Sequence, residues 1–431
     1  MPASPSLLIV PARFKTGKLY TQIATTSAGV VLASSGDFNV TRATTATRFN
    51  SAGLIESVAS GVPRLDYYTS GGTAGCPALL VEPSGTNLAF NSAQFDDAYW
   101  SKSSLNTSGS WVNVATAPDG TMTADKMIPN SVNTAHSINR TGFASAAYTF
   151  SVFAKADGES IISLWLRGNT VRAEFNLVSG TVSNITVTSA RIENYGNGWY
   201  RCSVYDSTAG TTIGIYNRAG GGFQGNDVDG VLLWGAQVET GSVATSYIPT
   251  TAAAVTRNAD QITVTGAVSG CIGQTQGTIY AEFRYLGVPP IRSGFVYLRT
   301  GGGFRGFSIN YSTSDLPLGI RFESRNANGT TSIQLTSGLT VGAYYKIAIA
   351  YDTGGTAAGG TQASGVTAYV NGSPATVSVG DLKVPSTDLN EVRLYGAISG
   401  SDSETPNGNI RSVALYTTKL SNAELAAITT P

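Results

Sequence analysis

Charged side chains are scarce in this chain. Asp, Glu, Lys and Arg make up 13% of its 431 residues, whereas about 25% is usual in globular domains. The 27 basic and 27 acidic residues cancel, and the basic residues do not gather into a tract. A nucleic-acid partner is therefore not expected, because binding to phosphates needs a basic patch. Disorder is not expected either, since 42% of the residues are hydrophobic.

Cysteine and histidine are almost missing. Cys76, Cys202 and Cys271 are far apart and form no CxxC pair, so the sequence predicts neither a disulfide framework nor a zinc site. Each is expected to be a buried, reduced thiol, as in a protein that folds in a reducing cytoplasm. The single histidine, His136, lies in the polar stretch VNTAHSINR. We expect a solvated or hydrogen-bonded side chain there rather than a general base, because no activating motif surrounds it.

Long apolar runs are absent as well. The first run, Leu7–Val10, is far too short for a signal peptide or a membrane span, and no basic residues precede it. No other run approaches the length needed to cross a bilayer. The sequence therefore predicts no membrane span and no classical secretion signal, and no cofactor is expected.

The chain is instead rich in glycine, with 50 residues, and in short segments that alternate apolar and polar side chains. Such segments, separated by turn residues, are typical of sandwiches and jelly rolls. Ser179-Gly180 and Asn371-Gly372 are predicted hairpin turns. The fold class expected is all-β, with two β-sandwich or jelly-roll domains in tandem preceded by an extended N-terminal arm. The predicted parts are an anchoring arm, residues 1–85, a jelly roll, residues 86–250, and a second sandwich, residues 251–431.

Two segments have distinct patterns. Residues 231–238, VLLWGAQV, are apolar on both faces, which predicts a strand covered on both sides, with Val231, Leu233, Gly235 and Gln237 on one face. The extended stretch that follows, 245–257, should bridge the two sandwiches. Near the C-terminus, SNAELAAI predicts a helix that starts with a capping box.

Several phrases together resemble bacteriophage virion proteins that carry a carbohydrate-binding-module-like jelly roll. They are CPALLVEPSGTNLAFNSAQFDDAYW, APDGTMTADKM, YTFSVFAKA, GNGWYR and WGAQVETGSVATSYIPT, with DFNVTRATTATRFNSAGLIESVASGVPRLDY upstream. The ending, NIRSVALYTTKLSNAELAAI, and the hairpin YVNGSPA are similar to laminin-G-like, concanavalin-A-like lectin domains. This resemblance implies sandwiches displayed on a particle surface, often as a homotrimer. It implies no shared catalytic residues.

The acidic residues give no strong indication of catalysis or of a metal site. A glycosidase needs two carboxylates facing the scissile bond, but Glu282 and Glu323 occur singly beside arginines, as expected for surface ion pairs. Asp227 and Asp229, in GNDVDG, could take part in a structural Ca²⁺ site. A turn stabilised by local hydrogen bonds is the simpler interpretation. We therefore predict no catalytic residues and no metal ligands, with the calcium question left open.

Aromatic residues beside polar ones indicate where a sugar could bind, because a pyranose stacks on an aromatic ring while polar groups take its hydroxyls. Two such sets occur on alternating strands, and both could equally be core or interface residues. The candidates are Ser163, Trp165 and Arg167, together with Tyr216 and Arg218. Three other tryptophans, Trp111, Trp199 and Trp234, are expected in the core or in contacts between subunits.

The N-terminal segment contains apolar clusters with few apolar neighbours in sequence. An exposed apolar segment usually marks a protein contact, so an arm that docks on capsid or tail is preferred to the alternative, an arm that packs on the adjacent sandwich. The residues predicted to dock are Leu7, Leu8, Ile9, Val10, Phe14, Leu19 and Tyr20.

These patterns and the resemblance favour a non-enzymatic virion protein assembled in the host cytoplasm. Its expected partners are other virion proteins, further copies of itself in a trimer, and a host surface glycan. Two alternatives stay open: a tail-borne depolymerase or glucanase, and a decoration protein that only stabilises the capsid.

Overall fold

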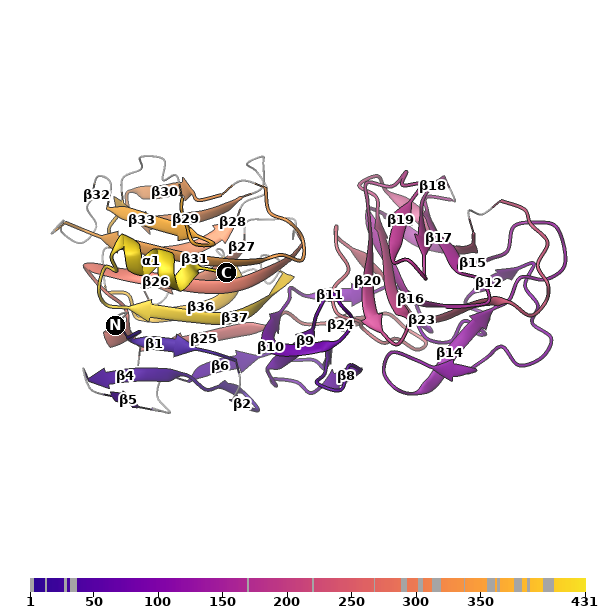
Figure 1. Ribbon diagram of the computed structural model, residues 1–431, viewed down its shortest axis with the longest axis horizontal. Helices are drawn as coiled ribbons and strands as arrows, with labels where there is room; N and C mark the ends of the chain where they lie inside the picture. The colour runs from indigo at the N-terminus through magenta and orange to yellow at the C-terminus, as the bar shows by residue number, and fades with distance from the viewer. Residues whose placement is uncertain are drawn as a thin grey trace.

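A computed structural model describes most of the chain. The described residues are 4–11, 14–26, 29–31, 37–168, 170–218, 221–266, 268–287, 293–300, 305–311, 319–336, 338–354, 361–362, 365–375, 382–385, 388–397 and 407–431. They form two β-sandwich modules side by side, with N-terminal strands running beneath one of them and reaching the other (Figure 1). The predicted all-β fold class is confirmed.

The jelly roll consists of two antiparallel sheets that enclose one core. In the first jelly-roll sheet the order is β12 (Ser101–Ser103), β15 (Ser137–Ala146), β22 (Gly210–Asn217), β17 (Ile161–Leu166), β18 (Val171–Asn176), β19 (Thr181–Ser183). In the second jelly-roll sheet it is β13 (Ala115–Thr116), β14 (Met122–Met127), β23 (Gly230–Thr240), β16 (Tyr148–Asp157), β21 (Trp199–Tyr205), β20 (Ser189–Gly196).

The C-terminal sandwich has two larger sheets. One has the order β34 (Ser373–Pro374), β33 (Val366–Val370), β31 (Tyr344–Asp352), β26 (Gln276–Gly287), β37 (Asn407–Tyr416), β1 (Leu7–Ile9), β4 (Gln22–Thr26), β5 (Gly29–Val31), and in it β10 (Ala74–Val81) pairs with β37 and β9 (Arg64–Tyr68). The other has the order β2 (Phe14–Lys15), β3 (Lys18–Leu19), β6 (Phe38–Thr41), β25 (Gln261–Thr265), β36 (Glu391–Ala397), β27 (Ser293–Arg299), β28 (Gly306–Tyr311), β29 (Ile320–Asn326), β30 (Gly329–Gln334).

Short elements complete the structure. They are the hairpin β7 (Ala46–Phe49) and β8 (Ile55–Val58), the pair β11 (Gly85–Asn87) and β24 (Val255–Arg257), the pair β32 (Thr361–Gln362) and β35 (Leu382–Lys383), a 3-10 turn at Ser269–Cys271, and helix α1 (Asn422–Thr429). The predicted capping box of α1 is confirmed: the Glu424 amide donates to Ser421 Oγ, and the Glu424 carboxylate accepts from the Ser421 amide. Both predicted hairpin turns are also present, between β18 and β19 and between β33 and β34.

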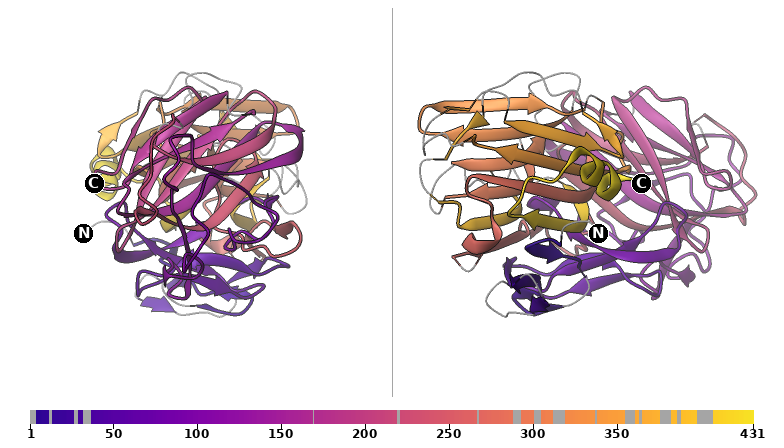
Figure 2. Two further views of the ribbon diagram at one scale, coloured as in Figure 1. Left: turned by 90° about the vertical axis from the view of Figure 1, so that its right-hand side faces the viewer. Right: turned by 60° about the vertical axis from the view of Figure 1, so that its left-hand side comes forward.

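The predicted N-terminal arm is part of the C-terminal sandwich. Strand β1 pairs with β37, with Leu7 opposite Leu415, and β6 pairs with β25, with Val40 opposite Ile262. Figure 2 shows these indigo strands continuing the layers of the orange and yellow module. The first region is therefore not a separate arm, because strands from both ends of the chain share sheets.

This pairing corrects the docking-arm prediction. The side chains of Leu7, Ile9 and Leu19 are fully buried in the sandwich core, and Leu8 packs against the α1 side of the same module. Of the remaining predicted docking residues, Phe14 is partly buried against the core, Tyr20 is half-buried and Val10 is exposed. These apolar residues are mostly buried against strands that are distant in sequence, so they do not form an exposed docking surface.

Strand β23 is covered on both sides, as predicted, but its register changes halfway. Val231, Leu233, Ala236 and Val238 face the jelly-roll core, whereas Trp234 packs on the opposite face. A bulge accounts for the shift: Gly235 has φ +65°, and the pairing with β16 skips a residue there. The predicted alternation through Gly235 and Gln237 is therefore wrong, because the bulge inverts the faces.

Predictions for the scarce residues have mixed outcomes. Cys202 and Cys271 are buried free thiols, as predicted, whereas Cys76 is exposed. Trp111, Trp199 and Trp234 are core residues, and all are less than a tenth exposed. Within the described residues, no helix is long and apolar enough to span a membrane.

Candidate functional site

The outer face of the first jelly-roll sheet brings together three of the predicted sugar-binding residues. In the β17–β22 register, Ser163 is opposite Tyr216 and Trp165 is opposite Gly214. Their strand neighbours Ile162, Leu164 and Leu166 point the other way, into the core. Alternation along β17 thus places the aromatic and hydroxyl side chains on the solvent side of the sheet.

Trp165 is held in place by its neighbours. Its indole Nε1 donates a 2.7 Å hydrogen bond to Ser163 Oγ, and its ring lies 5.2 Å from that of Tyr216, between centroids. The Arg172 guanidinium sits 4.6 Å from the indole centroid. Trp165 remains half-buried, whereas Ser163 and Tyr216 are buried. The indole is therefore the accessible part of this fixed cluster, which we call the aromatic face.

Arg167 and Arg218 lie outside the aromatic face. Each follows the last residue of its strand and has a positive φ, +53° and +54°. The alternation of side chains between the two faces of the strand, on which the prediction depended, ends before these residues. Arg167 pairs with Asp206 at 2.5 Å. Arg218 pairs with Glu159 at 2.9 Å and lies 4.0 Å from the Phe223 ring centroid. Both arginines stabilise loops.

Two acceptors on the aromatic face escaped the sequence analysis. Glu174 pairs across the strands with Ser163 and is 8% exposed; its Oε2 accepts a hydrogen bond from Asn184 Nδ2, 2.8 Å away. Its Oε1 lies 3.4 Å from Arg172 Nε but has no hydrogen-bond donor among the described residues. Asn139 donates to Ser137 Oγ and likewise leaves its Oδ1 without a described partner. Single-strand patterns cannot reveal these residues, because only the cross-strand register places them beside Trp165.

The residues weighed for catalysis have structural contacts. His136 is buried, with Nδ1 2.5 Å from Ser104 O and Nε2 2.9 Å from Phe223 O, so it holds two loops together. Glu282 is 3.3 Å from Arg411, a partly exposed pair as predicted. Glu323 is buried, which corrects its assignment to the surface. Glu282 and Glu323 lie on different sheets, in β26 and β29.

The segment with Asp227 and Asp229 is a turn. Asn226 Oδ1 accepts hydrogen bonds from the amides of Val228 and Asp229, at 3.0 Å and 2.8 Å, and Asp229 Oδ2 accepts one from Asn226 Nδ2 at 2.7 Å. Within the described part of the chain, no group of three or more His, Cys, Asp or Glu side chains is arranged to hold a metal ion. The local hydrogen bonds thus fit the simpler interpretation.

A buried charge network fixes the point where the chain crosses between the modules. Arg64 forms ion pairs with Asp260 and, at 2.6 Å, with Glu82. Asp260 also accepts from Arg42 at 2.8 Å, and Glu82 lies 3.6 Å from Arg257. Burial alone would raise the pKa of Glu82, but the charges of Arg257 and Arg64 outweigh it and lower that pKa to about 2. Glu82 is therefore held as a carboxylate.

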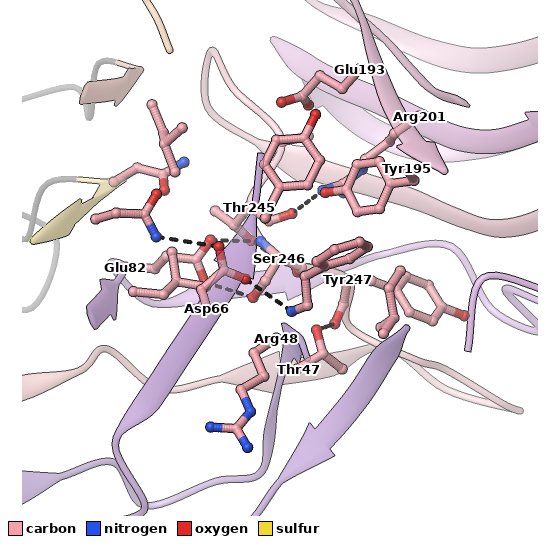
Figure 3. A pocket seen from close by; sticks show the side chains of 18 of the residues that line it. Thr47, Arg48, Asp66, Glu82, Glu193, Tyr195, Arg201, Thr245, Ser246 and Tyr247 are labelled. Atoms are coloured by element: carbon pink, nitrogen blue, oxygen red, sulfur yellow. Dashed lines mark hydrogen bonds between the residues drawn. The ribbon is translucent and has the colours of Figure 1, made fainter. Parts of the chain in front are cut away.

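A polar cavity of about 70 Å³ lies where the chain crosses between the modules, a region we call the seam (Figure 3). Its walls come from the N-terminal strands, the jelly roll, the bridge and the C-terminal sandwich. Asp66 Oδ1 accepts from the Phe49 amide at 2.9 Å, and Oδ2 accepts from Asn409 Nδ2 at 3.4 Å. Burial outweighs these contacts and raises the pKa of Asp66 to about 6.

The bridge between the modules is ordered by hydrogen bonds. Asn87 Nδ2 donates to Ile248 O at 2.9 Å, Thr47 Oγ1 to Tyr247 O at 2.5 Å, and the Ser246 amide to Glu82 Oε1 at 2.6 Å. Strand β24 then pairs with β11. The predicted extended bridge is thus confirmed, and the chain around it forms a packed joint.

The comparisons with known proteins concern the sandwich fold. Residues 235–426 match the Concanavalin A-like lectin/glucanases superfamily, and a search of curated proteins found no match. Similar solved structures include CBM40 of the Ruminococcus gnavus IT-sialidase, with 19% identity over 38% of this chain and 87% of that chain and a TM-score of 0.30. Domain 4 of AbnA, a GH43 extracellular arabinanase from Geobacillus stearothermophilus, is 9% identical over 44% of this chain and 84% of that chain, with a TM-score of 0.30.

The superfamily match begins within β23 and ends within α1. It leaves out β1 to β6, β9 and β10, the N-terminal strands that complete both sheets of the C-terminal sandwich. The C-terminal module is a lectin-like β-sandwich, completed in this chain by strands from the opposite end of the sequence.

Proposed function

We propose that the protein is a non-enzymatic bacteriophage virion protein that displays two joined β-sandwich modules and binds surface glycans weakly. The resemblance of several long phrases to phage virion proteins and the lectin-like fold of the C-terminal module support this proposal. Assembly into the virion takes place in the host cytoplasm, and the partners are virion proteins and further copies of the chain, as a trimer. Several copies on one particle multiply a weak affinity through avidity.

The aromatic face is the observation on which the glycan proposal depends. A sugar ring stacks on Trp165, which the buried ring of Tyr216 supports. Glu174 Oε1 and Asn139 Oδ1, which lack hydrogen-bond donors among the described residues, are acceptors on the same face of the sheet. Two buried acceptors beside an aromatic surface favour a ligand with several hydroxyl donors, since unsatisfied buried polar atoms are costly. The buried Arg64 network stabilises the crossing point between the modules.

A glycan array probed with the oligomeric protein tests the proposal. We expect binding to a subset of glycans, weakened about tenfold or more by Trp165→Ala, because stacking on this ring is lost. Trp111→Phe, a core substitution in the same module, serves as the control for folding and should bind normally. An array that stays blank at high protein concentration would favour a purely stabilising decoration protein, and release of reducing ends from host polysaccharide would favour a depolymerase.

A further inference from the structure

A second cleft lies on the other side of the jelly roll. It has a volume of about 520 Å³ and lies between hairpin β7–β8 and the second jelly-roll sheet. The Ile55 amide donates to Pro118 O at 2.9 Å, which ties the hairpin to the jelly roll. Trp234 and Tyr247, with ring centroids 4.5 Å apart, line its base. We call it the hairpin cleft; neither the jelly roll nor the N-terminal hairpin forms it alone.

One wall of the hairpin cleft has a fixed hydrogen-bond direction. At one end, Trp234 Nε1, which can only donate, gives its hydrogen to Thr123 Oγ1 at 3.1 Å. At the other end, Thr121 Oγ1 donates to the Asp119 carboxylate, Oδ1, at 2.6 Å. The two threonine hydroxyls are 2.6 Å apart. Because the hydrogen of Thr121 is already used, Thr123 must be the donor in that contact.

This relay leaves only acceptors for a ligand. Thr121 and Thr123 have each donated their single hydroxyl hydrogen and keep a lone pair. Asp119 Oδ2 makes no hydrogen bond with a described residue, and it accepts only. A ligand held against this wall must therefore supply hydrogen-bond donors.

The charged side chains around the hairpin cleft also favour a ligand that donates hydrogen bonds. The charged side chains that line it are the carboxylates of Glu56, Asp96 and Asp119, and no Lys or Arg is among the described lining residues. Glu56 is neutralised by Arg48 at 2.6 Å and also accepts from Asn50. Asp96 has Lys102 nearby, whose Nζ donates to the Asp96 carbonyl at 3.0 Å. No ion pair with a described residue involves Asp119, so its carboxylate favours a cation in the cleft.

We propose that the hairpin cleft binds a saccharide bearing a protonated amine, such as a unit of a glucosamine polymer. Sugar hydroxyls supply donors to Thr121 and Thr123, and an ammonium group, with three donors and no acceptor, fits Asp119. The resulting bond is charge-assisted and stronger than a neutral one. The site is separate from the aromatic face and does not depend on it.

Isothermal titration calorimetry of the full chain with three oligosaccharides of equal length tests this proposal. The probes are a glucosamine oligomer, its N-acetylated form and a cello-oligosaccharide, all at pH 6, where the free amines carry charge. We expect the glucosamine oligomer to bind at least tenfold more tightly than the other two, and we expect its affinity to fall as salt is raised. Equal affinity for the three probes, or no binding of the glucosamine oligomer, would overturn the proposal.

Two substitutions locate the site. Asp119→Asn keeps Oδ1 for the turn but replaces the acceptor Oδ2 with a donor, so we expect about a tenfold loss for the glucosamine oligomer. Trp165→Ala, on the aromatic face, should leave that affinity unchanged, and Asp97→Asn controls for the loss of one surface charge. If Trp165→Ala abolishes binding while Asp119→Asn does not, the ligand sits on the aromatic face and the hairpin cleft is not its site. If Asp119→Asn fails to fold, Asp96→Asn tests the same field, and unchanged affinity there would reject the site.

Discussion

The two modules of this protein are built from the chain in opposite ways. The jelly roll uses one continuous segment, with all strands of its two sheets between Ser101 and Thr240. The C-terminal sandwich takes its strands from both ends of the chain, and Leu7 lies opposite Leu415 in its sheet. The jelly roll is therefore inserted into the sandwich, and the chain crosses the seam twice, through β11 and β24.

This difference in chain origin determines which segments stabilise each module. The core between the two jelly-roll sheets contains side chains from its own segment alone, although Ile55 of the N-terminal hairpin joins the aromatic cluster on the outer face of the second sheet. The sandwich core includes Leu7, Ile9, Phe38 and Val40 from the N-terminal strands. Each such side chain contributes about 1.5–3 kcal/mol when buried. Because whole domains are stable by only about 5–15 kcal/mol, the sandwich cannot lose this set and remain folded.

The largest expected effect comes from separating the parts. Residues 86–250 expressed alone should fold and unfold cooperatively, whereas residues 258–431 alone should not, because β25 and β37 lose their N-terminal partners and the core is opened. Deletion of residues 1–41 from the full chain should likewise leave the jelly roll folded beside an unfolded sandwich. Circular dichroism and thermal unfolding measure both results. A cooperative transition in residues 258–431 alone would show that the N-terminal strands are not essential to the sandwich.

A smaller effect is expected at the buried charge network beside the crossing between the modules. Glu82→Gln should lower the free energy of unfolding by about 3–5 kcal/mol, because Arg64 and Arg257 then share a buried site with too little negative charge. Chemical denaturation measures the loss, and two separate transitions in place of one would show that the modules have become uncoupled.

The matched control is a carboxylate in a partly exposed ion pair. Glu56, whose side chain is 36% exposed, lies 2.6 Å from Arg48, and Glu56→Gln should cost less than about 1 kcal/mol. Equal losses in the two variants would mean that the seam network contributes no more than a surface pair.

The contrast between local contacts and contacts distant in sequence also explains which features the sequence could predict. Local patterns predicted the turn at Asn371-Gly372 and the capping box of α1, since both depend on near neighbours. The partnership of Leu7 with Leu415 has no local signal, so apolar N-terminal strands resembled a free arm. Ser163, Trp165 and Tyr216 were predicted because they share strand faces, whereas Glu174 and Asn139 needed the register across strands. The hairpin cleft was missed for the same reason, because its walls come from segments that meet only in the folded chain.

The smallest expected effect is a pH dependence located at the seam. Asp66 has a pKa raised to about 6 by burial, above its ordinary value of about 4. A raised carboxyl pKa stabilises the folded state below the unfolded pKa, and this contribution is lost as the pH rises through 6. The wild-type protein should therefore lose about 1–3 kcal/mol of stability between pH 4 and pH 7 through this group.

Asp66→Asn tests this assignment, because the amide cannot ionise. Its Oδ1 can still accept from the Phe49 amide, and Asn409, whose Oδ1 lacks a described partner, can turn its amide to accept from the new Nδ2. Denaturation at a series of pH values should show that the variant loses less stability than the wild type between pH 4 and pH 7, while Asp97→Asn, at an exposed site, leaves the profile unchanged. Parallel profiles for wild type and Asp66→Asn would mean that Asp66 stays ionised in the seam, and the cavity would then have to hold enough water to solvate that charge.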